Sequence, residues 1–248
     1  MATVVKKILS CGDTHKNGLA LNSLREEYNF EIQIKKLRRA RRMTLRVCQV
    51  TGELRVTTPL KVDLVSLKNF INFNLEWINT QIRAISPLIP VVEGLCIPIF
   101  GTKRVILADA YCEKKYCLDG DALKVPMDAP VFKKCVKSAL TQIAEEFFIE
   151  VCNAYAQKIG MSYSQISIRD PKSRWGSCSS EKKLMFSWRL IMAPKAVGSY
   201  VAAHEVAHLI YMDHSKDFWK LVNFICPSYV SNRNWLRDNG RKLHKFVF

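Results

Sequence analysis

Residues 204–219 read HEVAHLIYMDHSKDFW and hold three of the five histidines in the chain. Pro194 stands where a proline is tolerated at the start of a helix, so we expect a helix that runs through HEVAH to about Tyr211. On such a helix His204 and His208 share one face, with their Cβ atoms about 6 Å apart. Both imidazoles can then reach one metal ion.

The residues around this pair predict a catalytic rather than a structural metal site. His214 follows six residues after His208 and can fold back to complete a set of three ligands, which leaves a fourth position open to water. Zn²⁺ is the expected ion. Glu205 is well placed to act as the base that takes a proton from a zinc-bound water. Asp213 is an alternative ligand. The acceptor for the other ring N–H of a ligand histidine could be Asp213, Asp217, Glu150 or a backbone carbonyl.

Composition narrows the class of protein. The formal net charge of +16 favours an anionic partner, or reflects a basic surface that keeps the protein in solution. The nine cysteines include no CxxC pair, which is typical of a reducing compartment. We find neither a signal peptide nor an apolar run of the roughly 20 residues that a membrane helix needs. The sequence therefore predicts a cytoplasmic protein without membrane contact.

The chain is expected to be an α+β protein with a β-rich N-terminal module followed by a zincin-like domain with the HExxH helix. Residues 1–27 show little periodicity and are predicted to be a loose lead-in, with the module at 28–128 and the catalytic domain at 129–248. Within the module, alternation predicts strands at 30–37 and on either side of Thr51-Gly52, and the pattern at 64–82 predicts one helix.

The expected catalytic domain begins with a long helix over 131–160 that ends at Gly160. A strand, SQISIRD, follows. LMFSWRLIM at 184–192 alternates like the second strand of a hairpin, and further helices are expected at about 215–225 and 229–245.

Several motifs of the second half together resemble a known family. RWGSC at 174–178, WRL at 188–190, HEVAH at 204–208 and HSKDFW at 214–219 are similar to motifs of the YgjP-like metal-dependent hydrolases, which are related to the SprT-like and WLM-type zincins. The upstream KKLRRARRMTLRV is similar to the family's N-terminal β segment. The resemblance implies that His204, His208 and His214 bind zinc, that Glu205 is the catalytic base, and that the protein is a metallopeptidase. A metzincin is disfavoured, because Tyr211 stands where those proteins have glycine.

Other residues are candidates for substrate contact. Arg174 could hold a carboxylate or phosphate, or form a structural ion pair. LMFSWRLIM could receive a peptide as an added strand, with Arg189 near the cleft, or Arg189 could form a structural ion pair as well. Tyr211 could stabilise the oxyanion, as could Tyr229, although such tyrosines more often pack in a core.

The basic segment at 35–46 suggests contact with nucleic acid, or a solvated strand face. Three functions stay open: a zinc peptidase acting on a protein or peptide, a zinc hydrolase of a nucleotide phosphoanhydride or other anionic small molecule, and a DNA-associated protease or binding protein.

Overall fold

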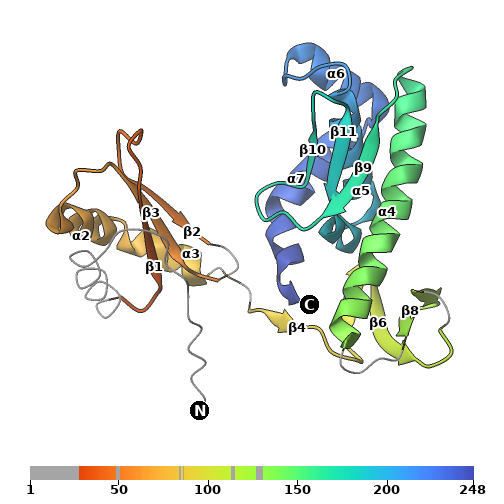
Figure 1. The fold of residues 1–248 in the computed structure, drawn as a ribbon, viewed down its shortest axis with the longest axis horizontal. Helices are drawn as coiled ribbons and strands as arrows, with labels where there is room; N and C mark the ends of the chain where they lie inside the picture. The colour runs from red at the N-terminus through yellow and green to blue at the C-terminus, as the bar shows by residue number, and fades with distance from the viewer. Residues whose placement is uncertain (1–27, 49–50, 84, 86, 113–114, 127–130) are drawn as a thin grey trace. The chain divides into compact units, whose positions relative to one another are not determined.

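Figure 1 shows the computed structural model, which describes residues 28–48, 51–83, 85, 87–112, 115–126 and 131–248. The chain is an α+β protein whose contacts divide it into two units, residues 1–86 and 87–248. The lead-in expected at 1–27 lies outside the described residues. Residues 87–128 belong to the C-terminal unit, so the division falls about forty residues before the expected boundary at 128.

The N-terminal unit pairs a small sheet with two helices. Its strands are β1 (Ile32–Lys36), β2 (Thr44–Val47) and β3 (Leu54–Thr58), with β3 in the centre, parallel to β1 and antiparallel to β2. The β2–β3 hairpin turns through Gly52 at φ 76°, as the Thr51-Gly52 signal predicts. One face of the sheet packs against the helices α2 (Leu64–Phe73) and α3 (Leu75–Arg83).

The prediction of a single helix over residues 64–82 is wrong, because the helix is interrupted at Asn74 and divides into α2 and α3. The Asn74 side-chain amide donates to the Phe70 carbonyl at 2.8 Å, and the Asn74 backbone N–H donates to Ile71. The side chain thus replaces the backbone as the partner of Phe70, and this competition ends α2.

The C-terminal unit begins with strands that pack on a long helix. The strands are β4 (Ile89–Pro90), β5 (Cys96–Ile99), β6 (Thr102–Asp109), β7 (Cys117–Asp119) and β8 (Ala122–Pro126). The last four form a sheet in the order β5-β6-β8-β7. Ile97, Ile106 and Leu123 of this sheet are fully buried in the same core as the helix α4 (Phe132–Lys158). This shared core explains why residues 87–128 join the C-terminal unit.

A second sheet lies over α4 and leads into the helix that carries HEVAH (Figure 1). It contains β9 (Gln165–Arg169), β10 (Gly176–Cys178) and β11 (Lys183–Ser187), in the order β10-β11-β9. The predicted hairpin is confirmed, but its second strand ends at Ser187 rather than at Met192. Residues Trp188–Met192 form the 3₁₀ helix η2, which buries four of its five side chains. A strand with one solvent face could not bury so many consecutive residues.

The remaining elements are mostly helical. They are α5 (Lys195–Ala207), α6 (Lys216–Ile225), α7 (Tyr229–Asn239), the 3₁₀ helix η3 (Gly240–His244) and β12 (Phe246–Val247), which pairs with β4. The helix expected to run to Tyr211 ends earlier, at Ala207, and the one expected to reach 245 ends at Asn239. Of the helices that the structure describes, none has the length and apolar character needed to cross a bilayer.

Candidate metal centre

The helix α5 carries the half-buried His204 and the buried Glu205, and the half-buried His208 follows as its C-cap residue. Pro194 caps its N-terminus, and Ala202, Ala203 and Ala207 are fully buried along its length. Such small side chains let α5 approach α4 closely; at Gly198 a Cβ would lie only 2.8 Å from a ring carbon of Phe147. Close packing therefore holds the HEVAH helix against the core.

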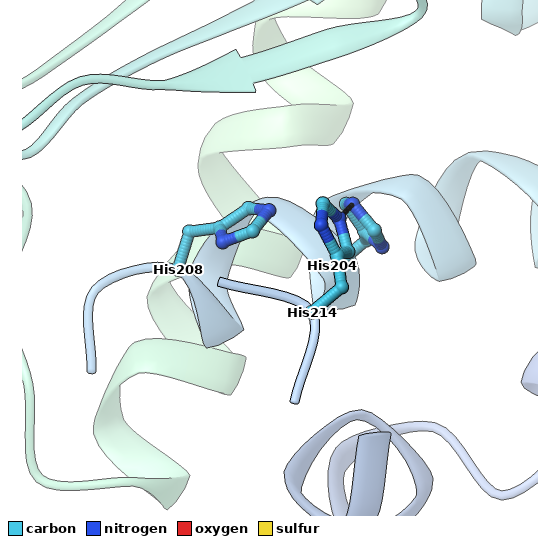
Figure 2. Close-up of side chains that lie close together, drawn as sticks. All are labelled: His204, His208 and His214. Carbon is cyan, nitrogen blue, oxygen red and sulfur yellow. Dashed lines mark hydrogen bonds between the residues drawn. The ribbon is translucent and has the colours of Figure 1, made fainter. Parts of the chain in front are cut away.

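His204, His208 and His214 meet at one point, as the sequence predicts (Figure 2). One ring nitrogen of each lies within 4.8 Å of the others, and Nε2 of His204 is 3.1 Å from Nε2 of His214. Two nitrogen ligands at ~2.0–2.1 Å from a tetrahedral ion are about 3.3 Å apart, so this spacing fits a shared metal ion.

Hydrogen bonding and burial prepare the rings for metal binding. His208 Nδ1 lies 2.8 Å from the Tyr211 carbonyl, which can only accept, so Nδ1 carries the proton and Nε2 is left bare. Burial, together with the charges of His208, His214 and Arg233, lowers the pKa of His204 to about 3, and burial also lowers the pKa of His208. Neutral imidazoles at neutral pH are the form that binds a cation.

The acceptor for His208 is thus a backbone carbonyl, one of the partners that the sequence left open. Asp213 accepts instead from the Ser215 N–H at 3.2 Å, and Asp217 pairs with Lys220. His204 Nδ1 is buried without a hydrogen-bond partner among the described residues.

Glu205 lies buried beside this cluster, with 6 % of its surface exposed. Burial raises the pKa of Glu205 to about 8, although the charge of Arg174 acts in the opposite direction. Within the part of the chain that the structure describes, no hydrogen bond holds its carboxylate. A carboxyl group with a pKa near neutrality suits a group that takes up and returns a proton. A bound divalent cation would favour its ionised form.

The RWGSC motif forms the wall against which Glu205 packs. A Cβ at Gly176 would lie 2.6 Å from Glu205 Oε1 and 2.7 Å from its Cγ, so only glycine leaves room for this side chain. Gly176 and its neighbours form β10, an edge strand of its sheet. Burial raises the pKa of the Cys178 thiol to about 11, which keeps it protonated and makes it a poor nucleophile.

The three candidate substrate residues lie in different settings. Arg174 is exposed, and its charge acts on the Glu205 carboxyl group. Tyr211 lies beyond the end of α5, and its backbone carbonyl accepts the hydrogen bond from His208 Nδ1.

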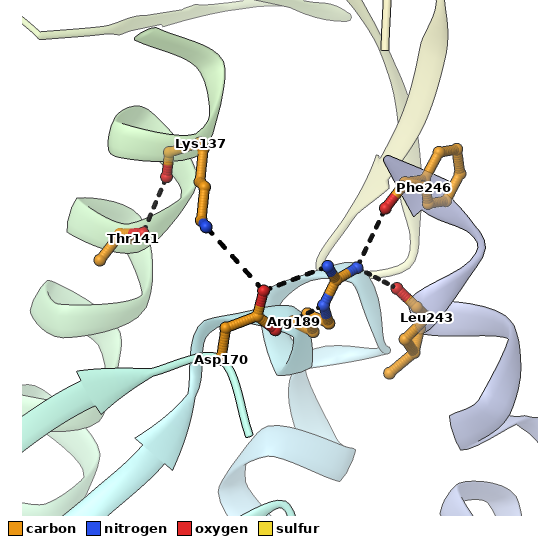
Figure 3. A network of polar contacts seen from close by, with 6 residues as sticks. All are labelled: Lys137, Thr141, Asp170, Arg189, Leu243 and Phe246. Carbon is orange, nitrogen blue, oxygen red and sulfur yellow. Dashed lines mark hydrogen bonds and ion pairs between the residues drawn. The ribbon is translucent and has the colours of Figure 1, made fainter. Parts of the chain in front are cut away.

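Arg189 sits in a structural network (Figure 3). Its guanidinium pairs with Asp170 at 2.7 Å and donates to the carbonyls of Leu243 and Phe246. The Arg189 side chain is only 12 % exposed. These contacts connect the end of β9 to the C-terminal segment, and they match the alternative interpretation of this arginine as part of a structural ion pair.

Phe218, Trp219 and Arg233 surround the histidines, and no role was predicted for them from the sequence. Phe218 is fully buried, and its ring centroid lies 4.6–5.0 Å from those of all three histidines. Trp219 lies 5.7 Å from His204, and Arg233 stacks on Trp219. Phe218 follows His214 by only four residues and lies in the first turn of α6. This closeness in the sequence is the signal that could have revealed its role.

The HEVAH helix with its buried Glu205, and the third histidine that joins His204 and His208, fit a metal-dependent hydrolase. Residues 41–239 match the family model described as YgjP-like, metallopeptidase domain. The chain belongs to the YgjP-like family, as the motif resemblance predicts. A search of curated proteins found no similar sequence. The metallopeptidase domain implies a bound metal ion, and the histidine cluster offers the place for it.

Proposed function

We propose that the protein is a zinc-dependent peptidase in which His204, His208 and His214 bind the metal and Glu205 is the catalytic base. The observation that carries the proposal is the convergence of three histidine nitrogens next to the buried Glu205, where His204 and Glu205 lie on α5 and His208 and His214 follow in the segment after it. Three histidine ligands are typical of catalytic zinc, which keeps its fourth position open. When bound, Zn²⁺ would polarise the substrate carbonyl and lower the pKa of water.

Glu205 supplies the proton transfers of this mechanism. Its carboxylate takes a proton from the attacking water and returns it to the nitrogen of the leaving amine. The raised pKa of Glu205, about 8, supports this role because a base with a pKa near the working pH holds and releases a proton with similar ease. Gly176 supports it too, since the absence of a side chain lets the carboxylate lie against β10.

A peptide substrate would bind along the edge strand β10. Among the described residues β10 pairs only with β11, so its other edge can accept main-chain hydrogen bonds from an extended chain. LMFSWRLIM cannot be that strand, because β11 is the central strand of its sheet and residues 188–192 are helical. In our proposal the peptide therefore pairs with β10, the strand of the RWGSC motif.

The test combines metal analysis with turnover. Purified protein should carry about one zinc per chain, and His208→Ala should lose most of it. Glu205→Gln should keep the metal and lose at least 100-fold in turnover of a labelled unfolded protein, a typical loss for a general base. Full zinc retention by His208→Ala would contradict the ligand assignment. Nucleotide hydrolysis without peptide cleavage would favour the phosphoanhydride alternative.

A specific observation also favours a nucleic-acid partner. Lys35, Lys36, Arg38, Arg39, Arg41, Arg42 and Arg46 are all exposed, and no described carboxylate forms an ion pair with any of them. On the sheet face away from α2 and α3, Lys35, Arg46 and Arg55 stand beside Thr44 and Thr57. The described strand residues of this face include no aromatic side chain on which a base could stack, so the phosphates of a duplex are the fitting ligand.

Duplex binding can be measured by fluorescence anisotropy over a range of salt concentrations. Replacing Arg38, Arg39, Arg41 and Arg42 by glutamine should weaken binding and flatten its salt dependence, because each lost phosphate contact reduces the slope by about 0.9. Lys133→Gln with Lys134→Gln, which removes exposed charges of α4, is the control. Equal weakening per removed charge in both variants would reduce the effect to net charge and contradict a dedicated surface. We also propose a cytoplasmic location, which agrees with the unpaired thiols of Cys96, Cys117, Cys135, Cys152, Cys178 and Cys226.

A further inference from the structure

An arginine stacked on an aromatic platform lies next to the histidine cluster. Trp219 of α6 and Tyr229 of α7 stack with ring centroids 5.6 Å apart. The guanidinium carbon of Arg233 lies 4.7 Å from the centroid of the Trp219 ring. The ring of Phe218 meets Trp219 edge-on at 5.1 Å. We call Trp219, Tyr229 and Arg233 the Arg233 platform.

Arg233 differs from the arginines that have structural roles in the same unit. Arg189 pairs with Asp170, and Arg237, one turn further along α7, pairs with Asp238 at 2.9 Å. Arg233 is exposed and forms neither an ion pair nor a hydrogen bond with any residue that the structure describes. Stacking covers one face of its guanidinium. The N–H groups lie in the plane of the guanidinium, so they stay free to bind a carboxylate through two parallel hydrogen bonds.

The platform adjoins the metal ligands directly. The Trp219 ring lies 5.7 Å from the ring of His204 and 5.9 Å from that of His214. The charge of Arg233 also contributes to the lowered pKa of His204, in keeping with this proximity. Arg233, which has no ion pair among the described residues, therefore acts on the His204 side of the centre, whereas Arg174 acts on Glu205.

We propose that the Arg233 platform is a carboxylate-binding subsite, which selects substrates with an acidic group close to the scissile bond. This inference rests on the proposed peptidase function and adds the class of substrate. The Arg233 guanidinium carbon lies 4.7 Å from the Trp219 ring centroid, which lies 5.7 Å from the His204 ring centroid. The guanidinium carbon is therefore no further from the His204 ring than the sum of these two distances. An extended peptide advances about 3.3–3.6 Å per residue, so a carboxylate one to three residues from the reacting carbonyl can reach Arg233.

The carboxylate can come from an aspartate or glutamate side chain or from the C-terminus of the peptide. Labelled peptides in matched pairs distinguish the two sources: Glu against Gln at successive positions, and a free against an amidated C-terminus. Binding is measured by anisotropy with zinc-loaded Glu205→Gln protein, which leaves the peptide intact. Cleavage by protein that retains Glu205 gives kcat and KM for the same pairs.

The acidic member of at least one pair should bind about 10- to 100-fold more tightly, the range for a charge-assisted hydrogen bond. Arg233→Gln should abolish this preference, and Arg233→Lys should restore only part of it, because an ammonium lacks the planar pair of donors. Arg237→Gln is the matched control, and it should keep the preference. Thermal melts and zinc content should be unchanged in all three variants.

Two results would overturn the subsite. One is equal binding of acidic and amide peptides to the parent protein; the other is an acidic preference that survives in Arg233→Gln. A failure of the peptidase proposal has a different signature. Carboxylate-dependent binding would persist and depend on Arg233, while no peptide would be cleaved even with Glu205 in place.

Discussion

Replacing Gly176 by alanine should displace the Glu205 carboxylate and little else. The added Cβ would lie 2.6 Å from Oε1, 2.7 Å from Cγ and 2.9 Å from Cδ of Glu205. Non-bonded carbon atoms prefer separations of about 3.5–4.0 Å, so the Glu205 side chain must move by roughly 0.8 Å. Gly176 is not among the glycines with positive φ, so the backbone accepts alanine and the effect comes from crowding alone.

A displacement of this size has a larger effect on catalysis than on folding. Misplacing a catalytic group by about 1 Å costs on the order of 100-fold in rate. Overpacking by one methyl group costs about 1–3 kcal/mol of unfolding free energy. We therefore expect Gly176→Ala to lose about 100-fold in kcat/KM on a labelled unfolded protein, while it keeps its zinc and remains folded at room temperature.

Gly198→Ala is the matched control. Its Cβ would lie 2.8 Å from a ring carbon of Phe147, so it creates similar crowding on the same helix as Glu205 but against a core ring. Both variants are compared by urea unfolding, zinc content and kcat/KM. If Gly176→Ala retained full activity, or if Gly198→Ala lost activity to the same extent, the link between Gly176 and the Glu205 position would be refuted.

Two further predictions concern stability. Arg189→Gln should lower the unfolding free energy by about 1–3 kcal/mol, because it leaves the carbonyls of Leu243 and Phe246 without their donor and breaks the ion pair with Asp170; no measurable loss in urea unfolding would contradict this. Burial, followed by the charge of Arg189, lowers the pKa of His244 in the folded protein, so below about pH 6.5 the unfolded state takes up a proton first and stability falls as the pH drops. Melting temperatures from pH 8 to pH 5 should decline less steeply in His244→Gln than in the parent, and parallel curves would refute the assignment.

The local pattern of the sequence was enough to predict the HEVAH helix and the convergence of His204, His208 and His214. His204 and His208 are four residues apart on one helix, and helical spacing alone places them on one face. The long helix α4 and the Gly52 hairpin were predictable for the same reason, since each depends on residues close in the sequence. His214 was within reach of the helix end and needed only a turn to join them.

Features that depend on distant contacts were not predictable from local pattern. Gly176 is required because Glu205, 29 residues later, packs against it. Arg189 looked like a cleft residue until its partners from β9 and the C-terminal segment were known. The break at Asn74 came from one side-chain hydrogen bond that a periodic pattern does not reveal. Burial and pairing, rather than residue type, decide such cases.

The pairing of β4 with β12 closes the C-terminal unit on itself. Ile89 pairs with Phe246 and Pro90 with Val247, and the Ile89 N–H donates to the Lys245 carbonyl at 2.8 Å. The unit is therefore entered and left at a single point on its surface, as in modules that tolerate insertion and circular permutation. A permuted chain that joins residues 248 and 87 by a short linker, and opens instead at the β7–β8 turn around Gly120, would leave every residue of the metal centre on an unbroken stretch of chain. The unit that carries the histidine cluster is thus suited to transfer into another protein as a single module.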